Sequence, residues 1–406
     1  MPLPGLDIKF SNGNLGRVTP LADGVFGLIC SAVSTADFEL DKAYPIRGMA
    51  DVVKLGILPD TDNYVLHKKL DGFYQEAGEG TKLWIMGMEK SDKPSDWFKK
   101  DDEGHRPATK LVDASNGEIS LIFTGFSPDA EYSETITDGV DSDLPNALSE
   151  AEAFAQEYLQ IKQVPLLVML EAYGFNGNAD DLTDFTEKSY ERVAVFIGDT
   201  EISGGASGNK NTAAEVLAGR LASIQVMENP GKVKLGPLKT LTAFIEDVAA
   251  EDFSVIDLHE KGYISFRTHP GKAGYYITDD PIATDPQSDY AHITLRRTID
   301  KAYRIAREEA AEELLNDFDV TNEGKISPFY ARAVEARIET AIFNLMSKNG
   351  ELSIDQTDKD DLGVKASFDT EENVVQTDTI KMKLRVRPKG YARWFIIDLG
   401  FDVNVN

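Results

Sequence analysis

The stretch PLLVML at residues 165–170 is apolar throughout, and a second such stretch, RVAVFI at 192–197, follows a polar segment. A helix-like pattern at 147–162 precedes the first stretch, and another at 212–226 follows the second. Strands that are apolar on both faces belong to sheets covered by helices on both sides, and such sheets are usually parallel. The pattern predicts a buried parallel sheet and an α/β fold over residues 20–275.

The residues before this region continue the alternation of strands and helices. In the segment 62–77, Leu66, Leu70 and Phe73 lie on one helical stripe, and Asp62 or Asn63 is suited to cap the helix. Strands are expected at 25–33, 82–88 and 118–123, and helices at 51–58, 62–77 and 107–114.

Three polar segments interrupt this pattern. Residues 90–106 are charged and rich in turn formers, so we expect a surface loop or a short exposed helix there. Residues 127–143 form an acidic loop. The aspartates, prolines and threonines of 279–287 indicate a boundary before the last part of the chain.

The last part of the chain predicts two helices followed by strands. The helices are expected at 290–316 and 328–346. In residues 380–387, apolar and basic side chains alternate strictly, which is typical of a strand with one buried and one positive face. A turn at 388–390 leads to a second alternating segment, 394–405, with acidic side chains. The two strands are suited to pair as a hairpin, either within one chain or between chains.

These patterns predict three parts in the chain. An N-terminal arm is expected at 1–18, because this segment has glycines, prolines and little apolar periodicity. The α/β core is expected at 19–278, with a subdivision near 90–145 as an alternative. A C-terminal α+β domain is expected at 279–406, and its last strand, 394–406, has an open edge that invites another chain.

Composition excludes several classes of function. The 42 basic and 69 acidic residues give a formal net charge of −27, which argues against nucleic-acid and anionic membrane partners. No run approaches the roughly 18 apolar residues of a membrane span, and residues 1–5 do not start a secretory signal. Cys30 is the only cysteine, so no internal disulfide forms, and we expect it to be a small buried apolar residue.

The sequence motifs that could bind a phosphate group or a calcium ion are incomplete. The glycine-rich segment 203–212 lies between a strand and a helix, but Asn209 and Asn211 break the spacing of a phosphate-binding loop. We interpret it as a loop that Asn211 or Thr212 caps. Residues 317–326 depart from a calcium-binding loop, since Tyr330 stands where a glutamate is required, and predict an inter-helical turn.

The histidines also provide no site. They show no paired metal-ligand spacing, and no Gly-x-Ser-x-Gly motif is present. No catalytic residue, cofactor or metal ligand is therefore predicted. The histidines are His67, His105, His259, His269 and His292.

The order of several segments resembles that of contractile phage tail sheath proteins, which are related to the sheaths of contractile injection systems. The first are DGVFGLI at 23–29 and LHKKLDGFYQEAGEGTKLWIMGM at 66–88. RVAVFI at 192–197, AAEVLAGRLA at 213–222 and NPGKV at 229–233 follow. The last third adds ITLRRTI at 293–299 and VRPKGYARWFI at 386–396. The resemblance covers most of the chain, and its weight lies in the combination and order of the segments.

The resemblance implies a subtilisin-like α/β core without catalytic residues, followed by a C-terminal α+β domain that faces the inner tube. It implies a homo-oligomer in which hexameric rings stack into a contractile helix. The implied partners are the tail tube protein and the baseplate and terminator proteins. The implied location is the virion tail, assembled in the host bacterial cytoplasm.

Sheath subunits of this family join through extended arms that add strands to neighbouring sheets, which agrees with the arms expected at both ends. We expect Lys381, Lys383, Arg385 and Arg387 to face Asp398 and Asp402, within a chain or between chains. Phe401, Val403 and Val405 complete the expected contact. The alternatives are another tail or baseplate assembly protein, or an α/β hydrolase-like enzyme with a polar pocket at the strand ends.

Overall fold

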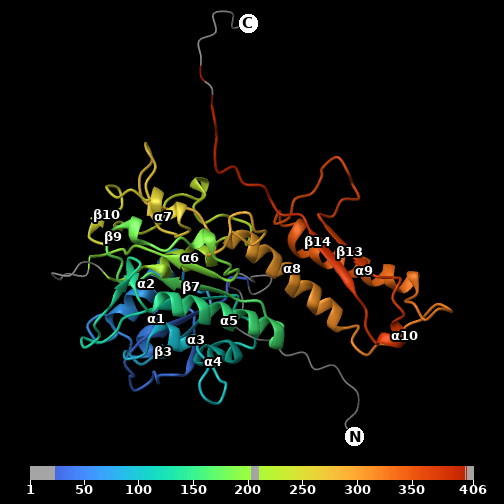
Figure 1. The fold of residues 1–406 in the computed structure, drawn as a ribbon, viewed down its shortest axis with the longest axis horizontal. Coiled ribbons are helices and arrows are strands. Elements are labelled where there is room, and N and C mark those ends of the chain that lie inside the picture. Colours follow the sequence, from blue (N-terminus) through green and yellow to red (C-terminus); the bar gives the residue numbers. More distant parts are fainter. Residues whose placement is uncertain (1–22, 203–209, 398, 400–406) are drawn as a thin grey trace, which may run out of the picture. The chain divides into compact units, whose positions relative to one another are not determined.

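The computed structural model describes residues 23–202, 210–397 and 399 (Figure 1). The chain divides into two compact units, Met1–Arg304 and Ile305–Asn406. The expected N-terminal arm at 1–18 lies outside the described residues. No helix in the described part of the chain has the length and apolar character needed to cross a membrane.

The first unit is built on a six-stranded sheet with the strand order β2-β3-β1-β4-β7-β8. All neighbouring strands are parallel except the edge strand β2, which is antiparallel to β3. The predicted parallel sheet is thus confirmed, and both quoted stretches supply strands to it. The strands are β1 (Phe26–Ser31), β2 (Ala43–Ile46), β3 (Leu83–Met88), β4 (Leu121–Gly125), β7 (Leu167–Glu171) and β8 (Val193–Phe196).

Helices cover both faces of this sheet (Figure 1). Side chains alternate along β1, so that Leu28 and Cys30 belong to one apolar core and Ile29 to the other. Cys30 is fully buried, as expected. Helices α2 (Tyr64–Ala77) and α6 (Ala214–Ser223) contribute to the first core, and α3 (Pro94–Phe98), α4 (Pro107–Ala114) and α5 (Leu144–Lys162) to the second.

The closest approach of α2 and α6 depends on a glycine. A Cβ atom added at Gly219 on α6 would lie 2.5 Å from the backbone oxygen of Phe73 on α2. Only the hydrogen atom of glycine fits at this position, because a Cβ atom so close to a backbone oxygen would overlap with it. Gly219 therefore sets the distance between the two helices that cover one face of the sheet.

Helix α8 (Ile293–Ala311) begins in the first unit, where its charged side chains bind the amino ends of the strands. The Arg304 guanidinium donates to the backbone oxygens of Gly117, Ile119 and Pro165 at 2.8–2.9 Å. Asp300 forms an ion pair with the buried Arg192 at 3.1 Å. These contacts attach the first part of α8 to the first unit, which ends at Arg304.

The remaining elements of the first unit are short. They include the two-stranded sheets β5–β6, β9–β10 and β11–β12. Their bounds are Ile136–Thr137, Val140–Asp141, Phe244–Ile245, Val248–Ala249, Phe266–Arg267 and Tyr276–Ile277 for these strands in chain order. The helical pieces are α1 (Met49–Lys54), α7 (Ile256–Glu260), η1 (Ala179–Asp181), η2 (Phe185–Glu187) and η3 (Val233–Leu235).

The second unit combines helices with a two-stranded antiparallel sheet, β13–β14. The turn before α9 places the ring of Phe318 on that of Tyr330, with centroids 5.0 Å apart, and it is an inter-helical turn as expected. The elements are α9 (Pro328–Ile342), the π-helical turn η4 (Phe343–Ser347), β13 (Val364–Phe368), α10 (Val374–Thr377) and β14 (Met382–Val386).

Several local predictions were wrong for identifiable reasons. The segment 90–106 is not simply exposed, because Trp97 and Phe98 of α3 are fully buried in the second core. Asn63 precedes α2 but does not cap it, since its side chain bonds both backbone groups of Val33 at 2.7–2.8 Å. Thr212 likewise leaves α6 without a side-chain cap. Tertiary partners compete successfully with local capping in these cases.

We expect Gly219→Ala to lower the free energy of unfolding by about 1–3 kcal/mol, as overpacking does elsewhere, although alanine favours a helix. Urea denaturation followed by circular dichroism measures the change. Gly390→Ala is the matched control, because a Cβ at Gly390 meets no atom within 4 Å. Equal stability of the two variants would contradict the role assigned to Gly219.

Candidate assembly interface

The predicted basic strand exists, and one of its two edges pairs with a strand that the sequence did not predict as its partner. Strand β14 pairs antiparallel with β13, in a register that places Leu384 opposite Ala366. Residues 388–397 contain no helix or strand. A tight hairpin turn generally needs positive φ, and Gly390 does not have it. The within-chain hairpin is therefore not formed by the described residues.

The basic side chains of this strand have two kinds of environment. Lys383 and Arg385 are exposed on the face of the β13–β14 sheet that also carries Lys365. Lys381 pairs with Glu372 at 2.8 Å, and Arg387 pairs with Asp361. The two outer basic residues thus each have an acidic partner within the second unit.

The pKa of Asp361 falls to about 2, because the amides of Asp355 and Gly363 donate to its carboxylate and Arg387 lies beside it. Asp361 therefore remains charged at neutral pH and holds the end of β14 to the loop before β13. The other expected contact residues, Asp398, Phe401, Asp402, Val403 and Val405, lie outside the described residues.

The two edges of the β13–β14 sheet differ. On β13, the amides of Ala366 and Phe368 donate to the carboxylates of Glu339 and Glu335 on α9, at 2.8 and 2.7 Å. On either side of β14, the Arg387 amide donates to the Gly363 oxygen, and the Lys381 oxygen accepts from the Asp369 amide. The backbone groups of the odd-numbered residues therefore face β13. The backbone groups of Met382, Leu384 and Val386 therefore point away from β13. Side chains of α9 occupy the edge of β13, whereas the sheet as described ends at β14.

An apolar segment follows this sheet. Its large side chains are at least 80% exposed, which is unusual for five apolar residues so close in sequence. Exposed apolar side chains in this number indicate a segment that another surface covers. They are Trp394, Phe395, Ile396, Ile397 and Leu399.

The carboxyl ends of the parallel strands hold a buried ionic cluster, at the place where α/β enzymes carry their sites. Lys69 of α2 contacts Glu171 at the end of β7 and donates to the backbone oxygen of Thr212 at 2.7 Å. Its ammonium lies 3.5 Å from Glu215 on α6. All three charged side chains are at most 3% exposed. The cluster binds α2, α6 and the sheet to one another.

Burial strongly perturbs this cluster. It raises the pKa of Glu171 to about 7, although Lys69 opposes the shift, and it raises the pKa of Glu215 as well. The adjoining cavity between Phe126, Asp143 and Tyr173 holds about 10 Å³, which is about the room of one water molecule. Perturbed acids are thus present as the hydrolase alternative requires, and the cavity that Glu171 lines is too small for a substrate.

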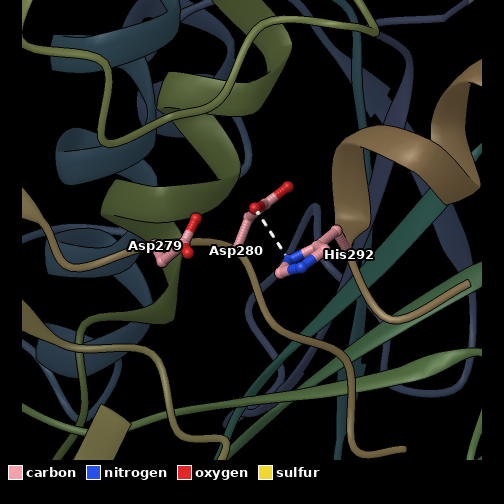
Figure 2. Close-up of side chains that lie close together, drawn as sticks. All are labelled: Asp279, Asp280 and His292. Atoms are coloured by element: carbon pink, nitrogen blue, oxygen red, sulfur yellow. Dashed lines mark ion pairs between the residues drawn. The ribbon is translucent and has the colours of Figure 1, made fainter. Parts of the chain in front are cut away.

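A second polar cluster lies before α8 and joins segments that are distant in sequence (Figure 2). Asp279 and Asp280 are buried, and the side-chain amide of Asn229 donates to both carboxylates at 2.6 and 2.7 Å. The amide of Thr294 donates to Asp280 at 2.8 Å. In Figure 2 the imidazole of His292 faces Asp280, with Nδ1 3.3 Å from its oxygen.

Sequence reasoning missed both buried clusters. Lys69 and Glu215 are widely separated in sequence, and each looks like an ordinary helical surface residue. His292 follows Asp280 by twelve positions, which is not a recognised ligand spacing. The interruption of the apolar stretch by Glu171 at the end of β7 was the one available signal.

The whole described arrangement has counterparts among solved structures. The helical sheath of the anti-feeding prophage in its contracted state matches with a TM-score of 0.62 and 15% identity, covering 99% of this chain and 100% of that one. The contracted PVC sheath complex of an extracellular contractile injection system matches with a TM-score of 0.62 and 14% identity, covering 99% and 98%. The sheath tail protein Lin1278 from Listeria innocua matches with a TM-score of 0.53 and 11% identity, covering 90% and 92%.

These similarities define the fold as that of contractile sheath proteins, and they confirm the resemblance seen in the sequence. The chain belongs to the DUF2586 family, whose N-terminal domain matches residues 3–281 and whose C-terminal domain matches residues 289–406. No curated protein matches the sequence significantly.

We expect Lys69→Ala to lower the free energy of unfolding by about 3–5 kcal/mol, because two buried carboxylates lose their cation. Chemical denaturation measures this loss. Lys54→Ala is the control, since it removes an equal charge from a pair whose lysine side chain is 75% exposed and should leave the denaturation midpoint nearly unchanged. A midpoint for Lys69→Ala equal to that of the control would show that the cluster does not hold the fold together.

Glu171 also predicts a pH dependence of stability. Its pKa in the folded protein, about 7, lies above its ordinary value of 4.5. The folded state therefore binds this proton more tightly than the unfolded state, and the associated stability is lost as the pH rises from 4.5 through 7. Glu171→Gln should lack this part of the dependence. Melting temperatures of both proteins between pH 5 and 8 test it, and parallel curves would contradict it.

Proposed function

We propose that this protein is the structural subunit of a contractile sheath, which polymerises around a tail tube and contracts to drive injection. The observation that carries the proposal is a sheath-protein fold that extends over 99% of the chain, both units included. The proposed partners are further copies of the chain, in stacked hexameric rings, together with tube, baseplate and terminator proteins. The proposed location is the tail of a virion or an injection particle.

The finer assignments are part of the same proposal. The parallel sheet with its carboxyl-end cluster is the subtilisin-like core, and the absence of enzymatic activity is supported by charged groups that are paired and sealed within it. We retain residue 279 as the boundary between the core and the C-terminal domain, which is supported by family models that meet between 281 and 289.

Subunits are joined by strand addition at the open edge of β14. Three features support this edge. Its backbone groups at Met382, Leu384 and Val386 point away from β13, carboxylates occupy the other edge, and the exposed apolar segment needs a covering surface. The basic face formed by Lys365, Lys383 and Arg385 favours an acidic strand of a neighbouring copy. Asp398 and Asp402 are the proposed acidic residues, with Phe401, Val403 and Val405 as the apolar contacts.

Truncation after Pro388 should abolish rings and tubes, because it removes the apolar segment and leaves both units otherwise intact. Negative-stain electron microscopy of the concentrated protein, with and without tube protein as a template, detects the polymers. Leu241→Ser is the control: this side chain is 91% exposed on the first unit, so its loss should leave assembly unchanged. Ordered polymers of the truncated chain would overturn the role of the C-terminal segment.

Leu384→Pro tests the edge itself. Its amide points away from β13, so proline removes a hydrogen-bond donor for a neighbouring strand while retaining the bonds to β13. Leu384→Ala is the matched control, because it removes the side chain and keeps the amide. We expect assembly to fail for proline alone, with circular dichroism spectra of both variants resembling wild type. Equal assembly of the two variants would exclude this edge.

A further inference from the structure

We propose that Asp279, Asp280 and His292 form a binding site for a divalent transition-metal ion such as Zn²⁺. One ligand atom from each side chain is available, and these atoms all lie within 4.8 Å of one another. Ligands at about 2.0–2.2 Å from a shared zinc ion lie somewhat closer together than this. The three ligand atoms would have to move closer together to bind one ion.

The chemistry of the three ligands selects the class of ion. Imidazole nitrogen combined with carboxylate oxygen suits Zn²⁺ and related transition ions, whereas Ca²⁺ and Mg²⁺ are bound through oxygen alone. Burial adds to this preference, because Asp280 is 0% exposed and Asp279 is 7% exposed. Carboxylates in such surroundings are commonly paired with a cation or bound to a metal.

Two buried polar atoms beside the carboxylates point independently to a further group. Nδ1 of His292 is buried, and its contact with Asp280 at 3.3 Å lacks the geometry of a hydrogen bond. The hydroxyl of Thr294 also has no partner, and this residue is 0% exposed. The Thr294 amide donates to the Asp280 carboxylate, so this residue lies beside the cluster. Unpaired buried polar atoms are rare in native proteins and commonly mark a bound water or ion.

The surrounding residues already orient the ligands. The side-chain amide of Asn229 donates to both carboxylates, and its own oxygen accepts from the amide of Gly231 at 2.8 Å. A bound ion would tie the Asn229–Gly231 turn, the segment before α8 and the first turn of α8 together. Its predicted consequence is a more stable first unit.

The test uses untagged full-length protein that has been treated with EDTA and dialysed. Isothermal titration calorimetry with Zn²⁺ should give a stoichiometry of one ion per chain. Co²⁺ should show visible d–d absorption when it binds to nitrogen and oxygen ligands. His292→Gln and Asp279→Asn should each weaken binding at least about 10-fold, the lower range found for groups that only support metal ligands. Zn²⁺ should raise the melting temperature of the wild type but not of these variants.

His259→Gln is the control, because it removes an exposed imidazole from α7 and should bind as the wild type does. Circular dichroism verifies that every variant is folded. Fewer than about one ion per five chains, or unchanged affinity in His292→Gln, would overturn the proposal and leave the cluster as a hydrogen-bonded cap of α8. These readouts do not depend on assembly, so they test the metal site separately from the sheath proposal.

Discussion

A parallel sheet whose strands are apolar on both faces must be covered by helices on both sides, and the rest of the first unit follows from this constraint. The helices α2 and α6 supply one cover, and α3, α4 and α5 supply the other. Because parallel strands require crossover connections, α2, α3, α4 and α5 also link successive strands, whereas α6 follows β8. The tight contact at Gly219 sets the distance between α2 and α6. Arg304 of α8 binds backbone oxygens at the amino ends of the strands.

Much of this architecture could be predicted, because continuous apolar runs and helical periodicity directly reflect burial. The positions of β1, β3, β7, α2 and α5 follow from such patterns to within a few residues. Local capping was less predictable. Asn63 has the chemistry of a cap, yet it bonds to Val33, which lies thirty positions earlier in the chain. A sequence pattern contains no information on a partner that only the tertiary fold supplies.

The segments of the proposed assembly interface were predicted only in part, because the sequence does not show which segments pair in the fold. The alternation of apolar and basic residues identified β14, and the apolar character of residues 394–397 was also visible in the sequence. Each of these features is a property of one continuous segment. The pairing of β14 with β13 was missed, because the alternation of apolar and polar residues at 364–368 is only five residues long. The buried clusters around Lys69 and Asp280 were missed because their members lie on separate elements, and charged residues are ordinarily expected on the surface.

The two edges of the β13–β14 sheet illustrate how a fold leaves one surface for assembly. Glu335 and Glu339 accept hydrogen bonds from β13, and a second strand could bind there only by displacing two carboxylates from their partners. No carboxylate occupies the outward groups of Met382, Leu384 and Val386, where the one side-chain hydrogen bond among the described residues runs from the exposed Arg385 to the Leu384 oxygen at 3.0 Å. The exposed apolar side chains at 394–397 add the burial that backbone pairing alone lacks. In the proposed polymer these two features favour strand addition at one edge, and an ordered polymer requires such a single, repeatable contact.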